Sequence, residues 1–371
     1  MLKHFSYNKA GLEPSAVDIV EGILALSRQT YANKKDPDYS DKNTFLCGAM
    51  ARYAVTGTKF ENRLAAIEEE DKKNEAARKL FEDALVRNNQ NVRSNFAIIL
   101  TQVINAIVPE VANDTYFRYL AETRQIGFGD TATFRIESND LFAVKDQAEG
   151  IRRTVDQPMW NDEITVPTHR VSLSSHIDWY PFAAGTFDMG NFGVKIARSI
   201  SAYIFIKAVK GMTAATTEFG AAYQAAGVSV QQWGTLKQRV QAANGGMKVI
   251  AIGTAIALSN ANISGNYQVE IGEEMTKVGY LDQYLGTPLI AIDNVLAPGA
   301  TNTTGALTIP DNIIYMVPVA GDKPVKIVFE GNQTSVSDDP ENTADERYGI
   351  TVSLRLGVSA VCGAKFGTIT L

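Results

Sequence analysis

The chain has 371 residues, of which 45% are hydrophobic and 20% are charged, so it can build a sizeable core and wholesale disorder is excluded. Lys and Arg number 35 against 41 Asp and Glu, and the net charge of −6 argues against a free duplex-DNA binder, which usually carries a basic surplus. The uninterrupted apolar runs are far shorter than the roughly 18 residues of a membrane-spanning helix, and no secretory signal follows Met1. At roughly 150 residues per domain, the length predicts two or three domains or one elaborate one.

The N-terminal residues 1–58 are predicted to be mostly irregular. One helix is expected over Ala16–Leu26 with Ser15 as its N-cap, and Pro37 in a polar break would end any helix that reached it. The following segment, Lys59–Arg93, is rich in helix formers and its charges balance, which is typical of a solvated, salt-bridged helix. The alternative for this segment is an arm that reaches a neighbouring subunit.

Three further helices follow from apolar spacing and from helix-breaking residues. The first is marked by apolar residues at spacings of three and four, and Pro109 is expected to close it. Asn191–Lys210 is predicted as one long helix, with Asn191 as N-cap and Gly211 as its stop. Val230–Ala243 is predicted as the third. The apolar residues that mark the first of these helices, the one before Pro109, are Val92, Phe96, Ile99, Leu100, Val103 and Ile107.

The period of the sequence changes to two after Gly129, which predicts strands. Thr131–Ile136 and Ile164–Leu173 are interpreted as a long two-stranded hairpin with an elaborated tip, although Pro167 interrupts the second strand. A lone hairpin is marginal in water, so something else must cover it. Further strands are predicted over Val249–Ile252, Leu289–Ile292, Ile313–Val317 and Val325–Phe329, and as a final pair over Tyr348–Leu356 and Val358–Ile369.

The tip of this hairpin holds the candidate inter-subunit contact residues. Trp, Met and Arg are enriched at protein interfaces, and the tip carries them close together. The candidates are Arg152, Arg153, Pro158, Met159 and Trp160. The alternative is that Trp160 folds back on its own hairpin, and a lone Lys145 is interpreted as solvated rather than as a crosslinking site.

No motif for catalysis, a cofactor or a metal is present. The sequence lacks a P-loop, an HExxH zinc motif and a GxSxG elbow. A turn at Gly253-Thr254 after a predicted strand could present N–H groups to an anion, but a plain turn is the favoured interpretation. Cys47 and Cys362 form no CxxC and are interpreted as free thiols. His169 and His176, an odd number of positions apart in a predicted strand, are expected on opposite faces.

The order of these elements resembles the major capsid proteins of tailed double-stranded DNA phages, which have the Hong Kong 97-type fold. The resemblance covers roughly residues 110–371. The hairpin return Glu163–Val171, followed by Trp179-Tyr180-Pro181 and the helix Asn191–Val209, carries part of it. Val249–Gly253 with Gly279-Tyr280-Leu281 and Gly286–Leu289 is similar to the axial domain of that family, and Arg347–Gly363 is similar to the last strands of its peripheral domain.

The resemblance implies an α+β fold with four parts. Residues 1–126 would be a largely helical N-terminal arm, and residues 127–180 an extended hairpin, the E-loop. A peripheral domain with a spine helix would comprise residues 181–214 and 331–371, and an axial domain residues 215–330. In many relatives an N-terminal scaffold segment is cleaved after assembly; here the chain starts at Met1, so none is expected to have been removed.

The function implied is that of a non-enzymatic shell protein without cofactors. Its copies would assemble as pentamers and hexamers into an icosahedral virion head in the host cytoplasm, enclosing double-stranded DNA. Scaffold, portal and decoration proteins are further expected partners, and a membrane is not. Two alternatives stay open: an encapsulin-like nanocompartment shell, and a soluble α/β enzyme with an unrecognised site. The shell hypothesis predicts a hairpin that its own chain buries poorly.

Overall fold

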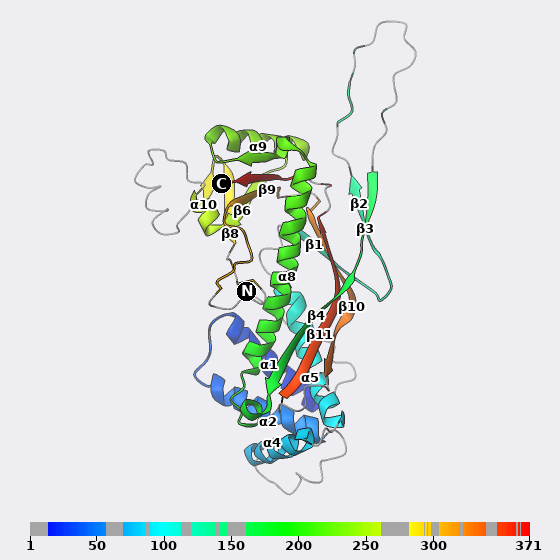
Figure 1. Cartoon of the computed structure of the whole chain (residues 1–371), viewed down its shortest axis with the longest axis vertical. Coiled ribbons are helices and arrows are strands. Elements are labelled where there is room, and N and C mark those ends of the chain that lie inside the picture. Colours follow the sequence, from blue (N-terminus) through cyan, green and yellow to red (C-terminus); the bar gives the residue numbers. More distant parts are fainter. Residues whose placement is uncertain are drawn as a thin grey trace, which may run out of the picture. The chain divides into compact units, whose positions relative to one another are not determined.

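The computed structural model, drawn in Figure 1 with its helices and strands labelled, divides into two compact units by its contacts. One unit comprises residues 1–114, 169–201 and 329–356, and the other comprises residues 115–168, 202–328 and 357–371. Three long elements contribute residues to both units: the helix Met189–Glu218 and the strands Val325–Asp338 and Arg347–Ala360. The residues that the structure describes are 14–56, 70–86, 90–112, 120–137, 141–144, 146, 157, 161–260, 282–292, 294, 296–297, 304–319, 322–338, 347–360, 363 and 365–371.

The N-terminal part of the first unit is helical. Its helices are α1 (Pro14–Tyr31), α2 (Tyr39–Thr56), α4 (Glu70–Val86) and α5 (Gln90–Ala112). The prediction that residues 1–58 are mostly irregular is therefore wrong. The buried face of α2 consists largely of small and sulfur-containing residues such as Cys47, Met50 and Ala51, and it lacks the stripe of large aliphatic residues that marks α5.

Helix α5 confirms the predicted apolar stripe, since all six of its marker residues are buried. Phe96 at its centre meets Phe182 edge to face, with ring centroids 5.3 Å apart. The helix runs three residues past Pro109, so this proline does not close it. A proline in the last turn removes one N–H donor, which a helix end tolerates better than a helix centre does.

The long predicted helix is present but has different ends. A short helix, α7 (Trp179–Ala183), precedes α8 (Met189–Glu218). The predicted N-cap is displaced: Asp188 accepts a hydrogen bond from the N–H of Asn191 at 2.9 Å. Gly211 does not stop α8. A Cβ on Gly211 would lie 3.2 Å from the Cβ of Ala360, so this glycine permits close packing instead.

A four-stranded sheet has the order β1-β10-β11-β4. Its strands are β1 (Ala121–Ile126), β10 (Val325–Asp338), β11 (Arg347–Ala360) and β4 (His169–Asp178). A separate two-stranded sheet is the hairpin of β2 (Ala132–Glu137) and β3 (Asn161–Val166). The hairpin prediction is thus confirmed for its first part only. Beyond Pro167 the chain leaves β2 and pairs with β11, because proline cannot donate to a continuing ladder.

The second unit contains a six-stranded sheet with the order β5-β12-β9-β6-β8-β7. Its strands are β5 (Gln224–Ala226), β6 (Val249–Thr254), β7 (Gln283–Tyr284), β8 (Thr287–Ile292), β9 (Ile313–Pro318) and β12 (Gly367–Thr370). Helix α9 (Val230–Ala243) has the predicted bounds, and it buries Trp233, Leu236 and Val240 in one core with β6, β8, β9 and β12. A 3-10 turn, η2 (Ala221–Tyr223), and a short helix, α10 (Ala255–Asn260), complete this part.

The predicted final strand pair is wrong. The segment Val358–Ile369 does not form one strand beside Tyr348–Leu356, because β11 continues to Ala360 and β12 pairs with β5 and β9. The turn after β6 is a plain one, as interpreted: the hydroxyl of Thr254 accepts a hydrogen bond from the N–H of Ala257 at 3.1 Å and so caps α10.

Candidate assembly hairpin

The root of the hairpin, that is, the paired strands β2 and β3, has its own small apolar core. The two strands pair antiparallel from Ala132↔Val166 to Glu137↔Asn161. Phe134 and Val166 pack with Ala132 and with Val328 of β10, and each of the four is at most 3% exposed. Since a two-stranded hairpin is only marginally stable alone, this contact with β10 explains how the root holds its conformation.

A buried ammonium group also ties the root together. Lys326 on β10 has a side chain that is only 1% exposed, and its Nζ lies 2.6 Å from Oε2 of Glu122 on β1. It also forms an ion pair with Asp322. The ring of Phe134 lies 5.2 Å from the same nitrogen. Two carboxylates and an aromatic face compensate a cation that would otherwise be costly to bury.

Glu122 also pairs with a second cation, Arg124, which lies over the ring of Phe134 on β2. Nε of Arg124 lies 2.9 Å from Oε1 of Glu122, and its guanidinium lies 4.1 Å from the centre of the Phe134 ring. Partial burial would raise the pKa of Glu122, but its hydrogen bonds to Lys326 and Arg124 hold that pKa below its usual value. The carboxylate therefore stays charged and links β1 to β10 on one side and to the face of β2 on the other.

Beyond the root, the hairpin exposes an apolar segment. Leu141 and Val144 are 94% and 97% exposed, and Phe142 between them is 58% exposed. The backbone of this segment is held by one side chain: the amide of Gln157 accepts from the N–H of Ala143 at 2.8 Å and donates to its carbonyl at 2.7 Å. Three exposed apolar side chains this close together form a surface that another chain can bury.

The structure does not test the contact residues predicted from the sequence. Arg152, Arg153, Pro158, Met159 and Trp160 lie outside the described residues, as does Lys145, so their role stays a prediction. The apolar segment 141–144 was missed. Its signal is the run Leu-Phe-Ala-Val between Asp140 and Lys145, which follows the end of the alternating pattern of β2.

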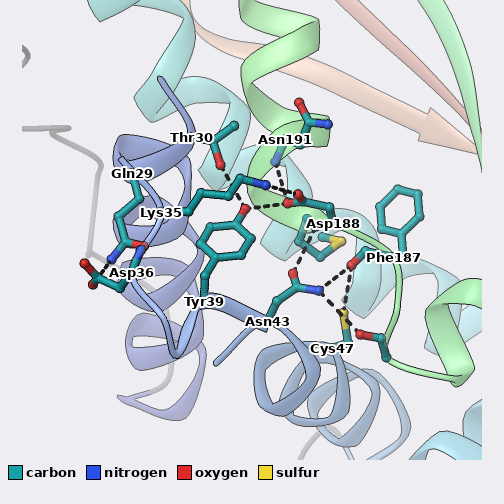
Figure 2. Close-up of polar contacts among 12 residues, drawn as sticks. Gln29, Thr30, Lys35, Asp36, Tyr39, Asn43, Cys47, Phe187, Asp188 and Asn191 are labelled. Atoms are coloured by element: carbon teal, nitrogen blue, oxygen red, sulfur yellow. Dashed lines mark hydrogen bonds and ion pairs between the residues drawn. The ribbon is translucent and has the colours of Figure 1, made fainter. Parts of the chain in front are cut away.

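A second polar centre fastens the N-terminal helices to α8 within the first unit (Figure 2). Asp188 lies at its middle, directly before α8. Its Oδ2 pairs with Nζ of Lys35 at 2.8 Å, and its Oδ1 accepts from the hydroxyl of Tyr39 at 2.5 Å. The Tyr39 hydroxyl also lies 2.8 Å from Oγ1 of Thr30. Burial would raise the pKa of Asp188, but the hydrogen bonds from Lys35, Tyr39 and the N–H of Asn191 hold it below its usual value.

Helix α2 contributes further contacts to this centre. Nδ2 of Asn43 donates to the carbonyl of Phe187 at 2.8 Å, and its Oδ1 accepts from the N–H of Met189 at 3.2 Å. Cys47 is a buried free thiol whose Sγ lies 3.5 Å from the same Phe187 carbonyl, and burial raises its pKa to about 12. Cys47 is thus a packing residue, while Cys362 lies outside the described residues.

The structure provides no metal centre among the residues it describes. His169 and His176 both lie on β4, in an unbroken register with β11, so they are on opposite faces as expected. Within the described ranges, no three His, Cys, Asp or Glu side chains are grouped so that they could hold a metal ion. The helices of those ranges also include none that is long and apolar enough to cross a membrane.

The class of the protein comes from comparison with known proteins. The family described as "SPbeta prophage-derived putative capsid protein YonB" matches residues 50–370. The chain belongs to this family, and it is a structural protein of a phage-type capsid. The resemblance to phage capsid proteins is confirmed by this match, and the expected α+β class is confirmed by the observed helices and sheets.

Solved capsid chains are similar to this one. The capsid of a native GTA particle is 14% identical with a TM-score of 0.46, over 70% of this chain and 90% of that chain. The capsid of the cyanophage P-SCSP1u is 11% identical with a TM-score of 0.45, over 69% and 88%. The mature capsid of bacteriophage PhiM1 is 8% identical with a TM-score of 0.43, over 70% and 87%. No curated protein matches the chain.

Proposed function

We propose that this protein is the major capsid protein of a tailed-phage head, in which many copies form a closed icosahedral shell around double-stranded DNA. The shell is held by many modest contacts between copies rather than by chemistry, so the protein acts without catalysis or a cofactor. Membership in a prophage capsid family supports this function over an enzyme and over an encapsulin-like nanocompartment.

The observation that carries the mechanism is the exposure of Leu141, Phe142 and Val144 on a hairpin whose paired strands are anchored to β10. Leu141 and Val144 are the most exposed large apolar side chains of the described residues. Leaving them in water gains nothing for a single chain, whereas burial against a neighbouring copy contributes about 25 cal/mol per Å² of apolar surface. In this proposal the segment 141–144 packs against a neighbouring copy. The ion pairs of Lys326 hold the hairpin root in the conformation that this contact requires.

The proposed parts of the subunit follow the same scheme. Residues 1–126 would form the arm, and the E-loop would be shortened to 127–168 because β4 pairs with β11. Residues 169–214 with 331–366 would form the peripheral domain around α8. Residues 215–330 would form the axial domain, to which we now add β12 because it pairs within that sheet. Pentamers and hexamers of the chain, with scaffold, portal and decoration proteins, would assemble in the host cytoplasm.

The test is a double variant, Leu141→Ser with Val144→Ser, compared with Val319→Ser. Val319 is also exposed, at 50%, but it lies outside the hairpin. Because these side chains have little packing to lose, all variants should keep the unfolding free energy within about 0.5 kcal/mol of the wild type. Negative-stain microscopy should show shells for the wild type and for Val319→Ser but not for the double variant. Shells of normal yield from the double variant would refute the role of this segment.

A further inference from the structure

The turn between β7 and β8 has an unusual backbone for its sequence. Tyr284 pairs with Thr287, which leaves Leu285 and Gly286 as a two-residue turn. Their φ angles are 47° and 66°, the positive values of a type I′ turn, which favours Asn, Asp or Gly at both positions. Among the described residues, Leu285 and Asn33 are the non-glycine residues with positive φ, and Asn tolerates this conformation where Leu does not.

Contacts with α9 hold this strained turn in place. Nζ of Lys237 donates to the carbonyl of Leu285 at 2.7 Å. Trp233 of α9 contacts both strands that flank the turn. Its ring meets that of Tyr284 on β7 edge to face, with centroids 5.1 Å apart, and its Nε1 lies 3.4 Å from Oγ1 of the buried Thr287 on β8. Contacts from α9 thus constrain the turn on both sides, and they hold Leu285 in its strained conformation.

The side chain of Leu285 gives little packing in return for this strain, because it is 46% exposed. A residue that is both conformationally disfavoured and half in water is a local conflict, and such conflicts are kept at functional positions. The position is also at a sheet edge, since β7 is the last strand of the six-stranded order. This edge strand has only two residues, which is too short to template an open-ended strand addition.

We propose that Leu285 is a contact residue for a second copy of this chain, presented by a turn that is strained for this purpose. This inference rests on the proposed capsid function, which requires each subunit to bury surface on its neighbours. A constrained turn tip can insert one apolar side chain into a neighbour with little loss of conformational freedom on binding.

Two substitutions separate this role from a structural one. Leu285→Asn relieves the backbone strain and removes the apolar side chain, so it should raise the unfolding midpoint of the unassembled subunit. The same variant should raise the critical concentration for shell assembly, on the order of tenfold if the contact contributes about 1.4 kcal/mol. Leu285→Met keeps both the strain and an apolar side chain, and it should assemble like the wild type.

The outcomes distinguish this inference from the proposed function. If wild-type shells form and Leu285→Asn assembles at the wild-type critical concentration, the contact role of Leu285 is refuted and the capsid function stands. If Leu285→Asn lowers the unfolding midpoint, the strain argument is refuted as well. If the wild type forms no shells at all, the proposed function itself fails, and the contact has no second copy to bind.

Discussion

Lys326 on β10 and Glu122 on β1 form an ion pair of 2.6 Å between a buried ammonium and a carboxylate, beside the first strand of the assembly hairpin. The pair connects sequence positions that are far apart, and it lies next to the core of Phe134 and Val166. The hairpin is therefore anchored at its root by both charge and apolar packing, while its apolar segment 141–144 is left exposed.

Replacing Lys326 with Met should destabilise the subunit, because Glu122 and Asp322 would lose the cation that compensates them. We expect a loss of about 2 kcal/mol in the free energy of unfolding, less than for a fully enclosed pair because both carboxylates keep contact with water. Urea denaturation of the unassembled subunit measures it. The control is Lys79→Met, which removes the exposed pair of Lys79 with Glu75 and should cost less than about 0.5 kcal/mol.

The centre at Asp188 should make stability depend on acid. Its pKa is lowered in the folded state, so the carboxylate stabilises the fold above the ordinary carboxyl pKa of about 3.9. This stability is lost as the pH falls through the lowered, folded-state pKa. Asp188→Asn should therefore flatten the fall in unfolding free energy that begins below about pH 5. Lys35→Met, which removes a partner that lowers this pKa, should move acid unfolding to higher pH. An unchanged acid profile in both variants would contradict this role.

The side chain of Gln157 should control how firmly the apolar segment is held. Gln157→Ala removes both hydrogen bonds to the backbone of Ala143. Hydrogen exchange at residues 141–144 should become faster, while the thermal midpoint should stay the same because both groups are exposed. Equal exchange rates in the two proteins would show that something other than Gln157 orders this segment.

Two glycines should respond to alanine in opposite directions. A Cβ on Gly357 of β11 would lie 2.5 Å from the carbonyl oxygen of Pro167, where backbone must shift, so Gly357→Ala should cost about 1–3 kcal/mol. Gly234 in α9 has nothing within 4 Å of an added Cβ, and Gly234→Ala should stabilise by about 0.5–1 kcal/mol through helix propensity. Thermal unfolding of both variants checks the pair, and a Gly357→Ala variant as stable as the wild type would contradict the packing at Pro167.

Local patterns predicted the elements whose apolar residues are large and regularly spaced. Helix α9 has the predicted bounds, and the predicted apolar stripe of α5 is buried throughout. Helix α2 was missed because small residues bury its face, and β4 was joined to the hairpin because alternation continues past Pro167 while the partner strand changes. Strand partners such as β12 with β9 depend on tertiary contacts, which no local pattern contains.

The predicted contact residues and the exposed apolar segment lie on different parts of the same hairpin, and the role of the predicted residues stays a prediction. The sequence indicated a hairpin whose far end binds another copy. The aromatic and basic residues near Trp160 placed the predicted contact before the second strand of the hairpin. The exposure of Leu141 and Val144 follows from where β2 stops, and the buried position of Lys326 follows from strand pairing. Neither is visible until the chain is folded.

The most direct test of the account is whether the purified protein assembles, measured by sedimentation velocity with negative-stain microscopy of the same sample. The account predicts closed shells of uniform size, together with rings of five or six subunits at lower concentration. A chain that stays monomeric or dimeric at every concentration and salt condition would contradict it.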